Sequence, residues 1–159
     1  MPLFSEKNLD FIADQLSKHD ICILNDAVPE ATVASLYDEA RSCYSEFKAA
    51  GVGRGGSHQV DQNIRGDQIL WMSDRSEMQR WWLENMDILM NGLNRRLFLG
   101  LFSHEAHYAQ YKPGAFYEKH VDAFKGRSNR ILSMVTYLNP DWQRDWGCLL
   151  YTSPSPRDS

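Results

Sequence analysis

A histidine and an aspartate two residues apart, His120 and Asp122, have the clearest chemical potential in this sequence. On a β-strand, residues two apart project to the same face, so this imidazole and carboxylate would lie side by side. They would supply two of the three ligands of a 2-His-1-carboxylate site for non-haem Fe(II), which keeps positions open for a co-substrate and O₂. The chain has five histidines, so a His-x-Asp match alone is weak, and a surface histidine paired with a carboxylate is the alternative.

Two tyrosines could reach the same pocket. Pro113-Gly114 predicts a turn just before the strand that carries His120, and Tyr111 precedes this turn. Residues 130–138 alternate as a strand, and Tyr137 lies on one of its faces. Tyr111 and Tyr137 are therefore candidates for lining a pocket beside the iron. The alternative is that both tyrosines pack in the core.

The elements that must position these residues are predicted as helices first and strands afterwards. Apolar residues at helical spacing predict helices from the N-cap Ser5 to about Lys18, from Pro29 to about Ala50, and from about Ser76 to Leu97. Short or alternating apolar runs predict strands over 20–24, 64–71, 104–112, 116–122 and 130–138. This order indicates an α+β protein, or helices packed on a β-sandwich or barrel.

A glycine-rich segment interrupts this pattern between the second helix and the next strand. Four of the six residues from Gly51 to Gly56 are glycine, which predicts a mobile loop. The spacing is not that of a phosphate-binding loop, so a flexible lid is the better interpretation.

Composition narrows the class of protein. The chain has 159 residues, 43% of them hydrophobic, and a net charge of -4. The length suits one domain with its own core. The acidic balance argues against a nucleic-acid partner held by phosphate contacts, and no apolar run approaches the length of a membrane span. There is no recognisable signal peptide and the three cysteines lack metal or redox spacing, so a cytoplasmic enzyme is expected.

The last dozen residues, Cys148 to Ser159, do not continue the pattern that precedes them. Their sequence matches an in-frame translation of a transposase-type sequencing adapter. We therefore expect a natural domain segment over residues 1–147 and a disordered, adapter-derived tail over 148–159. A natural tail rich in proline and serine is the alternative.

Several motifs in order resemble the 2-oxoglutarate- and Fe(II)-dependent dioxygenase superfamily, and within it the bacterial prolyl hydroxylases related to the oxygen-sensing enzymes. The resemblance covers essentially residues 1–147, and its motifs are Ile64-Arg65-Gly66-Asp67, Tyr111-x-Pro-Gly, Tyr117-x-x-His120-x-Asp122, Arg130 and Tyr137-Leu138-Asn139-x-x-Trp142. It implies a double-stranded β-helix (jelly-roll) core, incomplete at the C-terminus, with the N-terminal helices packed on one sheet.

The resemblance also implies a role for each matched residue. His120 and Asp122 resemble the first two iron ligands, and Tyr111 and Tyr137 resemble the tyrosines of the 2-oxoglutarate site. Three charged residues resemble the substrate-binding mouth: Arg65, Asp67 and Arg130. Within this group we predict a salt bridge between Asp67 and Arg130. Arg65 and the Gly51–Gln62 region resemble the mobile loop that closes over a peptide substrate.

The resemblance implies Fe(II), 2-oxoglutarate and O₂ as cofactors and co-substrate, and ascorbate as the reductant that keeps the iron active. The implied substrate is a prolyl residue of a cytosolic protein, with a translation protein such as an elongation factor or a ribosomal protein as the family-level expectation. Two required groups, a second histidine ligand and a distal arginine, have no counterpart after Gly147. We therefore expect this chain to turn over little and to be marginally stable. A free amino acid or other small molecule as substrate, and a non-catalytic binding or sensing module that has lost its iron site, are the alternatives.

Overall fold

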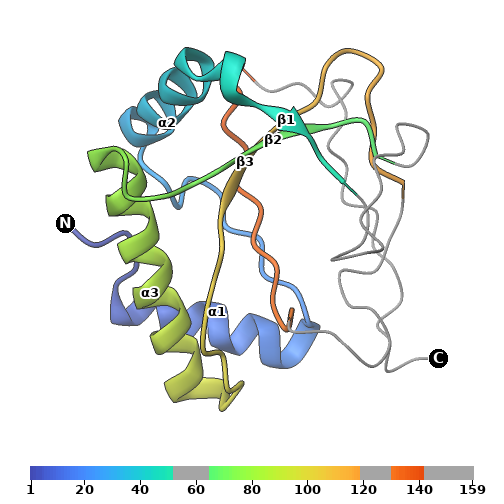
Figure 1. The fold of residues 1–159 in the computed structure, drawn as a ribbon. Coiled ribbons are helices and arrows are strands. Elements are labelled where there is room, and N and C mark those ends of the chain that lie inside the picture. Colours follow the sequence, from blue (N-terminus) through green and yellow to red (C-terminus); the bar gives the residue numbers. More distant parts are fainter. Residues whose placement is uncertain (52–64, 119–129, 142–159) are drawn as a thin grey trace.

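The structure, a computed structural model, describes residues 1–51, 65–118 and 130–141 (Figure 1). Helices pack on a small antiparallel sheet, an α+β arrangement as predicted. The elements in chain order are α1 (Glu6–His19), α2 (Glu30–Ser42), the 3₁₀-helix η1 (Tyr44–Glu46), β1 (Lys48–Ala49), β2 (Gln68–Trp71), α3 (Glu77–Leu97) and β3 (His107–Gln110). The glycine-rich segment from residue 52 onward and the C-terminal tail lie outside the described residues.

Helix α1 begins where its sequence predicts. The Ser5 hydroxyl accepts a hydrogen bond from the backbone N–H of Asn8 at 3.2 Å, and the Asn8 side chain accepts one from the Ser5 N–H, which together form a capping box. The buried residues of α1, Leu9 among them, pack against α3 in one apolar cluster. The two helices approach closely at Gly92, where a Cβ atom would lie 2.6 Å from Leu9 Cδ1.

Helix α3 also agrees with its prediction, since the Ser76 hydroxyl caps its first turn and the helix ends at Leu97. Helix α2 is shorter than predicted and ends at Ser42, not near Ala50. The chain turns through η1 into β1 instead, because backbone pairing with β2 satisfies its polar groups: the N–H of Ala50 donates to the carbonyl of Asp67 at 3.0 Å. Tertiary pairing thus overrides helical spacing here.

Two predicted strands are wrong, and a third is only partly described. Residues 20–24 follow α1 without strand structure, and their apolar side chains pack on the helical cluster instead. Residues 130–138 also carry no strand, although Leu132 and Leu138 contact the two apolar clusters. A strand requires a hydrogen-bonded neighbour, and no described segment pairs with either one. Of the segment 116–122, the described part makes one isolated antiparallel bridge, between Tyr117 and Arg65.

The sheet has the order β1-β2-β3, with Leu70 opposite Tyr108 and Trp71 opposite His107. Alternation gives this sheet two unlike faces. Leu70 and Tyr108 pack toward the helices, in a cluster with Leu36 of α2 and Trp82 of α3. The residues of opposite parity face away from the helices: Ile69, Trp71, His107 and Ala109. We call this second side the open face.

A buried polar network ties the helices to the sheet. Glu39 of α2 accepts hydrogen bonds from the Tyr108 hydroxyl at 2.9 Å and from the Gln79 amide of α3 at 3.1 Å. The Gln79 carbonyl oxygen in turn accepts from the backbone N–H of Ser73 at 2.9 Å. Burial, and then the hydrogen bond to Glu39, raise the pKa of Tyr108 far above its ordinary value. These hydrogen bonds therefore hold α2, α3 and β3 in fixed positions relative to one another, behind the open face.

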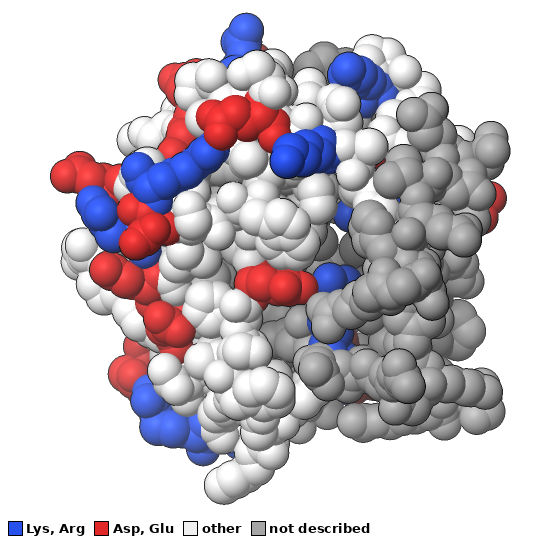
Figure 2. All heavy atoms as spheres, in the orientation of Figure 1, with Lys and Arg blue, Asp and Glu red and all other residues white. Residues whose placement is uncertain are grey.

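Acidic and basic side chains are interspersed over the helical side of the molecule in the view of Figure 2. Ion pairs account for part of this pattern: Arg96 of α3 lies 2.7 Å from both Glu6 and Asp10 of α1. None of the described helices is long and apolar enough to cross a membrane.

Candidate functional site

The centre of the candidate site is an ion pair at the start of β2. The Asp67 side chain is fully buried, and Arg65 donates to its two oxygens at 2.7 and 3.1 Å. A third Arg65 N–H points at the carbonyl of Gly51 at 3.4 Å, and the guanidinium carbon lies 4.5 Å from the centre of the Tyr117 ring. Burial opposes the charge on Arg65, but the hydrogen bond and the charge of Asp67 outweigh it and raise the arginine's pKa.

The predicted salt bridge between Asp67 and Arg130 is wrong. Both carboxylate oxygens of Asp67 are taken by Arg65, while Arg130 lies 3.3 Å from Glu105. The reason is proximity in the sequence. Arg65 precedes Asp67 by two residues, so both side chains lie on the same face of the sheet. Arg65 is also mostly buried, and it is therefore the nearest cation that can neutralise the buried carboxylate.

The open face also carries an aromatic pair. The rings of Trp71 and His107 meet edge to face, with centroids 4.9 Å apart and planes at 74°. Burial, followed by the positive charge of Arg65, lowers the pKa of His107, and Arg130 acts in the same direction. His107 is therefore neutral at neutral pH. Sequence reasoning gave this histidine no role, although the spacing 107, 109, 111 puts it on one face with Tyr111.

The two predicted tyrosines are half-exposed, at 41% for Tyr111 and 45% for Tyr137. This exposure excludes the alternative that both are core residues. Tyr111 lies within electrostatic reach of Arg65, as Tyr117 does. No described contact joins Tyr137 to this group. Sequence reasoning matched Tyr117 to the family without giving it a role, because only the fold brings its ring over the guanidinium.

The predicted iron ligands, His120 and Asp122, lie outside the described residues. Within the described ranges, no three His, Cys, Asp or Glu side chains are grouped so that they could hold a metal ion. The predicted 2-oxoglutarate residue Tyr111 presents a 41% exposed phenol, a group that can hydrogen-bond to a carboxylate, and it lies within electrostatic reach of Arg65.

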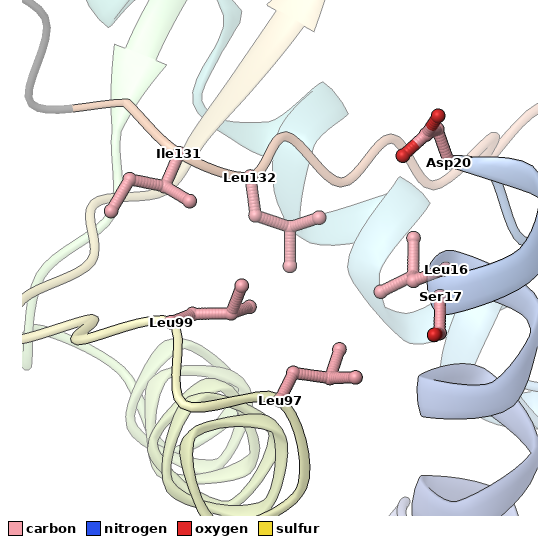
Figure 3. Close-up of a pocket in the computed structure, with 7 residues that line it drawn as sticks. All are labelled: Leu16, Ser17, Asp20, Leu97, Leu99, Ile131 and Leu132. Atoms are coloured by element: carbon pink, nitrogen blue, oxygen red, sulfur yellow. The ribbon is translucent and has the colours of Figure 1, made fainter.

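Two cavities differ in chemistry. One, of about 350 Å³, lies between the ends of α1 and α3 and the segment 131–132, and its leucine side chains point into a common space (Figure 3). It contains no predicted site residue. The other, of about 330 Å³, is lined by Arg65 and Asp67 together with smaller or polar residues: Ala49, Gly66, Gln68, Lys112, Gly114 and Ala115. Its polar lining marks the second cavity as part of the site.

Comparison with known proteins identifies relatives of this chain. The sequence model of the 2OG-Fe(II) oxygenase superfamily matches residues 106–157. Egl nine homolog 1 of Homo sapiens is 30% identical over 144 residues, which are 84% of this chain and 33% of the human protein. The Mus musculus protein of the same name is 30% identical over 142 residues, 84% of this chain and 35% of its own length. This chain thus spans about a third of these curated relatives.

A solved structure decides the family. The crystal structure of a Pseudomonas putida prolyl-4-hydroxylase superposes with a TM-score of 0.72 at 36% sequence identity, covering 86% of this chain and 71% of that one. The chain belongs to the 2OG-Fe(II) oxygenase superfamily. The resemblance inferred from the motifs is confirmed, and membership implies Fe(II), 2-oxoglutarate and O₂ as the reacting set. The region matched by this oxygenase family includes His120 and Asp122.

Proposed function

We propose that this oxygenase hydroxylates a prolyl residue of a protein substrate in the cytoplasm. The observation that carries the proposal is the similarity to a prolyl-4-hydroxylase structure over 86% of the chain. The match of residues 106–157 to the 2OG-Fe(II) oxygenase superfamily supports the hydroxylation chemistry. We further propose that the three strands belong to a double-stranded β-helix core, with the N-terminal helices packed on one of its sheets.

Two pairs of residues would hold the cofactors. His120 and Asp122 would ligate Fe(II), and Tyr111 and Tyr137 would donate hydroxyl hydrogen bonds to the carboxylates of 2-oxoglutarate. When bound, iron and 2-oxoglutarate would supply the oxidant that hydroxylates an unactivated carbon with O₂, and ascorbate would keep the iron reduced. The exposure of the Tyr111 hydroxyl-bearing side chain supports its part in this assignment.

The remaining residues of the open face would shape the substrate site. Arg65, neutralised by Asp67 and lying over Tyr117, makes a rigid wall without a free charge. The Trp71–His107 pair adds an aromatic wall without a net charge, because the lowered pKa of His107 favours the neutral imidazole. Arg130, which is half-exposed and lies 3.3 Å from Glu105, would contribute to the substrate mouth. These walls would exclude water from the reacting carbon.

The reaction also requires a second histidine ligand and a cation for the distal 2-oxoglutarate carboxylate. The sequence has no histidine after His120. We therefore propose that the 159-residue chain binds iron and 2-oxoglutarate weakly and turns over little. We also propose a translation protein as the natural substrate. A free amino acid as substrate, and a binding or sensing module without chemistry, remain the two competing functions.

The test measures binding before turnover. Affinity for 2-oxoglutarate is measured by calorimetry with the full chain and Mn(II), which replaces Fe(II) without redox chemistry, for the original sequence and for Tyr111→Phe. Loss of one hydroxyl donor should weaken binding about fivefold to tenfold. Tyr44→Phe is the matched control, since Tyr44 is also 41% exposed but lies on η1.

Each outcome separates the candidate functions. Binding that needs Mn(II) and falls in Tyr111→Phe supports the oxygenase assignment. Binding that is independent of metal favours the sensing module. With Fe(II), succinate release that depends on a prolyl peptide, even at a low rate, supports the prolyl substrate, whereas release with free proline alone supports the small-molecule substrate.

A further inference from the structure

The polar cavity beside the Arg65–Asp67 pair carries more binding groups than the pair itself uses. The cavity has a volume of about 330 Å³, at the small end for ligand sites. Much of its wall is made by small residues, among them Gly66, Gly114 and Ala115. A Cβ at Gly114 would meet no atom within 4 Å, so the wall is open there. The space suits a side chain, not a whole peptide.

The charged side chains in the cavity lining do not cancel one another completely. Arg65 and Asp67 neutralise each other, with N···O distances of 2.7 and 3.1 Å, and Asp67 has no exposed side-chain surface. Lys112 is the other charged residue of the lining, and its ammonium forms no ion pair or hydrogen bond among the residues that the structure describes. Counting only residues 1–51, 65–118 and 130–141, the cavity therefore presents one positive charge without a counter-charge.

A second polar group in the lining is also available. Gln68 also lines this cavity, is half-buried, and makes no side-chain hydrogen bond within the described ranges. A lysine and a glutamine that line one cavity can together hold a carboxylate, the first by the charge of its ammonium and the second by its amide N–H donors. The buried Asp67 carboxylate does not repel such a ligand strongly, because Arg65 cancels its charge.

We propose that this cavity binds an acidic side chain of the protein substrate, with Lys112 and Gln68 as the residues that hold its carboxylate. The inference rests on the proposed prolyl hydroxylase function and names a specificity determinant within it. Arg65 and Asp67 form a wall common to the cavity and the candidate site, so the glutamate or aspartate would lie in the same polypeptide as the target proline, a few residues away.

The test uses the full chain and fluorescein-labelled nine-residue peptides with a central proline in an alanine-glycine background. One glutamate is moved through the other positions, and each peptide is compared with its glutamine counterpart by fluorescence anisotropy at low salt. At the correct position we expect glutamate to bind about fivefold more tightly than glutamine, the scale of one partly exposed ion pair, with the preference reduced by added salt.

Charge reversal makes the assignment specific. Lys112→Glu should abolish the preference for glutamate and favour a lysine peptide. Lys48→Glu is the matched control, because Lys48 is exposed on the neighbouring strand β1 and does not line the cavity. The same change at Lys48 should leave the glutamate preference intact.

Failure of this inference can be distinguished from failure of the proposed function. Binding that requires the proline but is equal for glutamate and glutamine overturns this inference and leaves the proposed function standing. Binding that is unchanged when proline is replaced by alanine contradicts the proposed function itself. If succinate displaces the glutamate peptide and Lys112→Glu weakens succinate to the same extent, the cavity is a co-substrate subsite and the inference is overturned.

Discussion

Breaking the Arg65–Asp67 pair from the arginine side should cost this protein a large part of its stability. Arg65→Met removes the guanidinium but keeps a side chain of similar length. The Asp67 carboxylate, with 0% side-chain exposure, would then lose hydrogen bonds of 2.7 and 3.1 Å and remain buried without a counter-charge. Removing one partner of a buried pair typically costs about 3–5 kcal/mol.

The structure indicates that the loss in free energy of unfolding lies near the lower end of this range. Arg65 retains 15% side-chain exposure, so some water can reach the vacated space and solvate the carboxylate. Loss of the contact with the Tyr117 ring at 4.5 Å adds about 0.5–1 kcal/mol. We expect a total near 3–4 kcal/mol, against a whole-domain stability of about 5–15 kcal/mol.

The assay is urea denaturation of the full chain followed by far-ultraviolet circular dichroism. The double variant Arg65→Met/Asp67→Leu removes the buried charge as well as its partner, so it should be more stable than Arg65→Met alone. Arg95→Met is the control, since Arg95 is 61% exposed and its pairing with Glu6, at 3.5 Å, should contribute little. An Arg65→Met effect below about 1 kcal/mol, or a double variant no more stable than the single one, would refute the argument.

Further predictions concern Gly92, Tyr108 and His107. Gly92→Ala should destabilise the chain by about 1–2 kcal/mol in urea denaturation, because a Cβ 2.6 Å from Leu9 Cδ1 outweighs the better helix propensity of alanine, and Leu9→Ala should relieve the clash. Tyr108→Phe should cost about 1–2 kcal/mol by leaving Glu39 short of one donor. Since the raised pKa of Tyr108 keeps its proton in the folded state, stability should fall as pH rises above 10 in the original chain and fall less in Tyr108→Phe. The lowered pKa of His107 means that the unfolded chain binds its proton first, so stability should decline as pH falls through 6.5, and less so in His107→Gln; an NMR titration midpoint above 6.5 would contradict this.

Much of the helical scaffold could be predicted because its signals are local. Ser5 and Ser76 cap α1 and α3 through hydrogen bonds to residues three positions later, and such bonds depend on nearby sequence alone. The early end of α2 could not be predicted, since β1 exists only through pairing with β2, a segment distant in sequence. The strand predicted over residues 130–138 is wrong for the same reason, because alternation predicts a strand but does not identify the strand with which it would pair.

For the site, the sequence by itself determined the family and the residue types, because ordered motifs around Tyr111, His120 and Asp122 need no contact to be recognised. Only the tertiary structure decided how the charges pair. Asp67 bonds to Arg65 and not to Arg130, because Arg65 is buried beside it, whereas Arg130 is 43% exposed and lies against Glu105. It also decided that His107 shares the open face with Trp71 and that Lys112 lines the polar cavity. Electrostatic partners and cavity walls depend on distances through space, which a linear pattern does not contain.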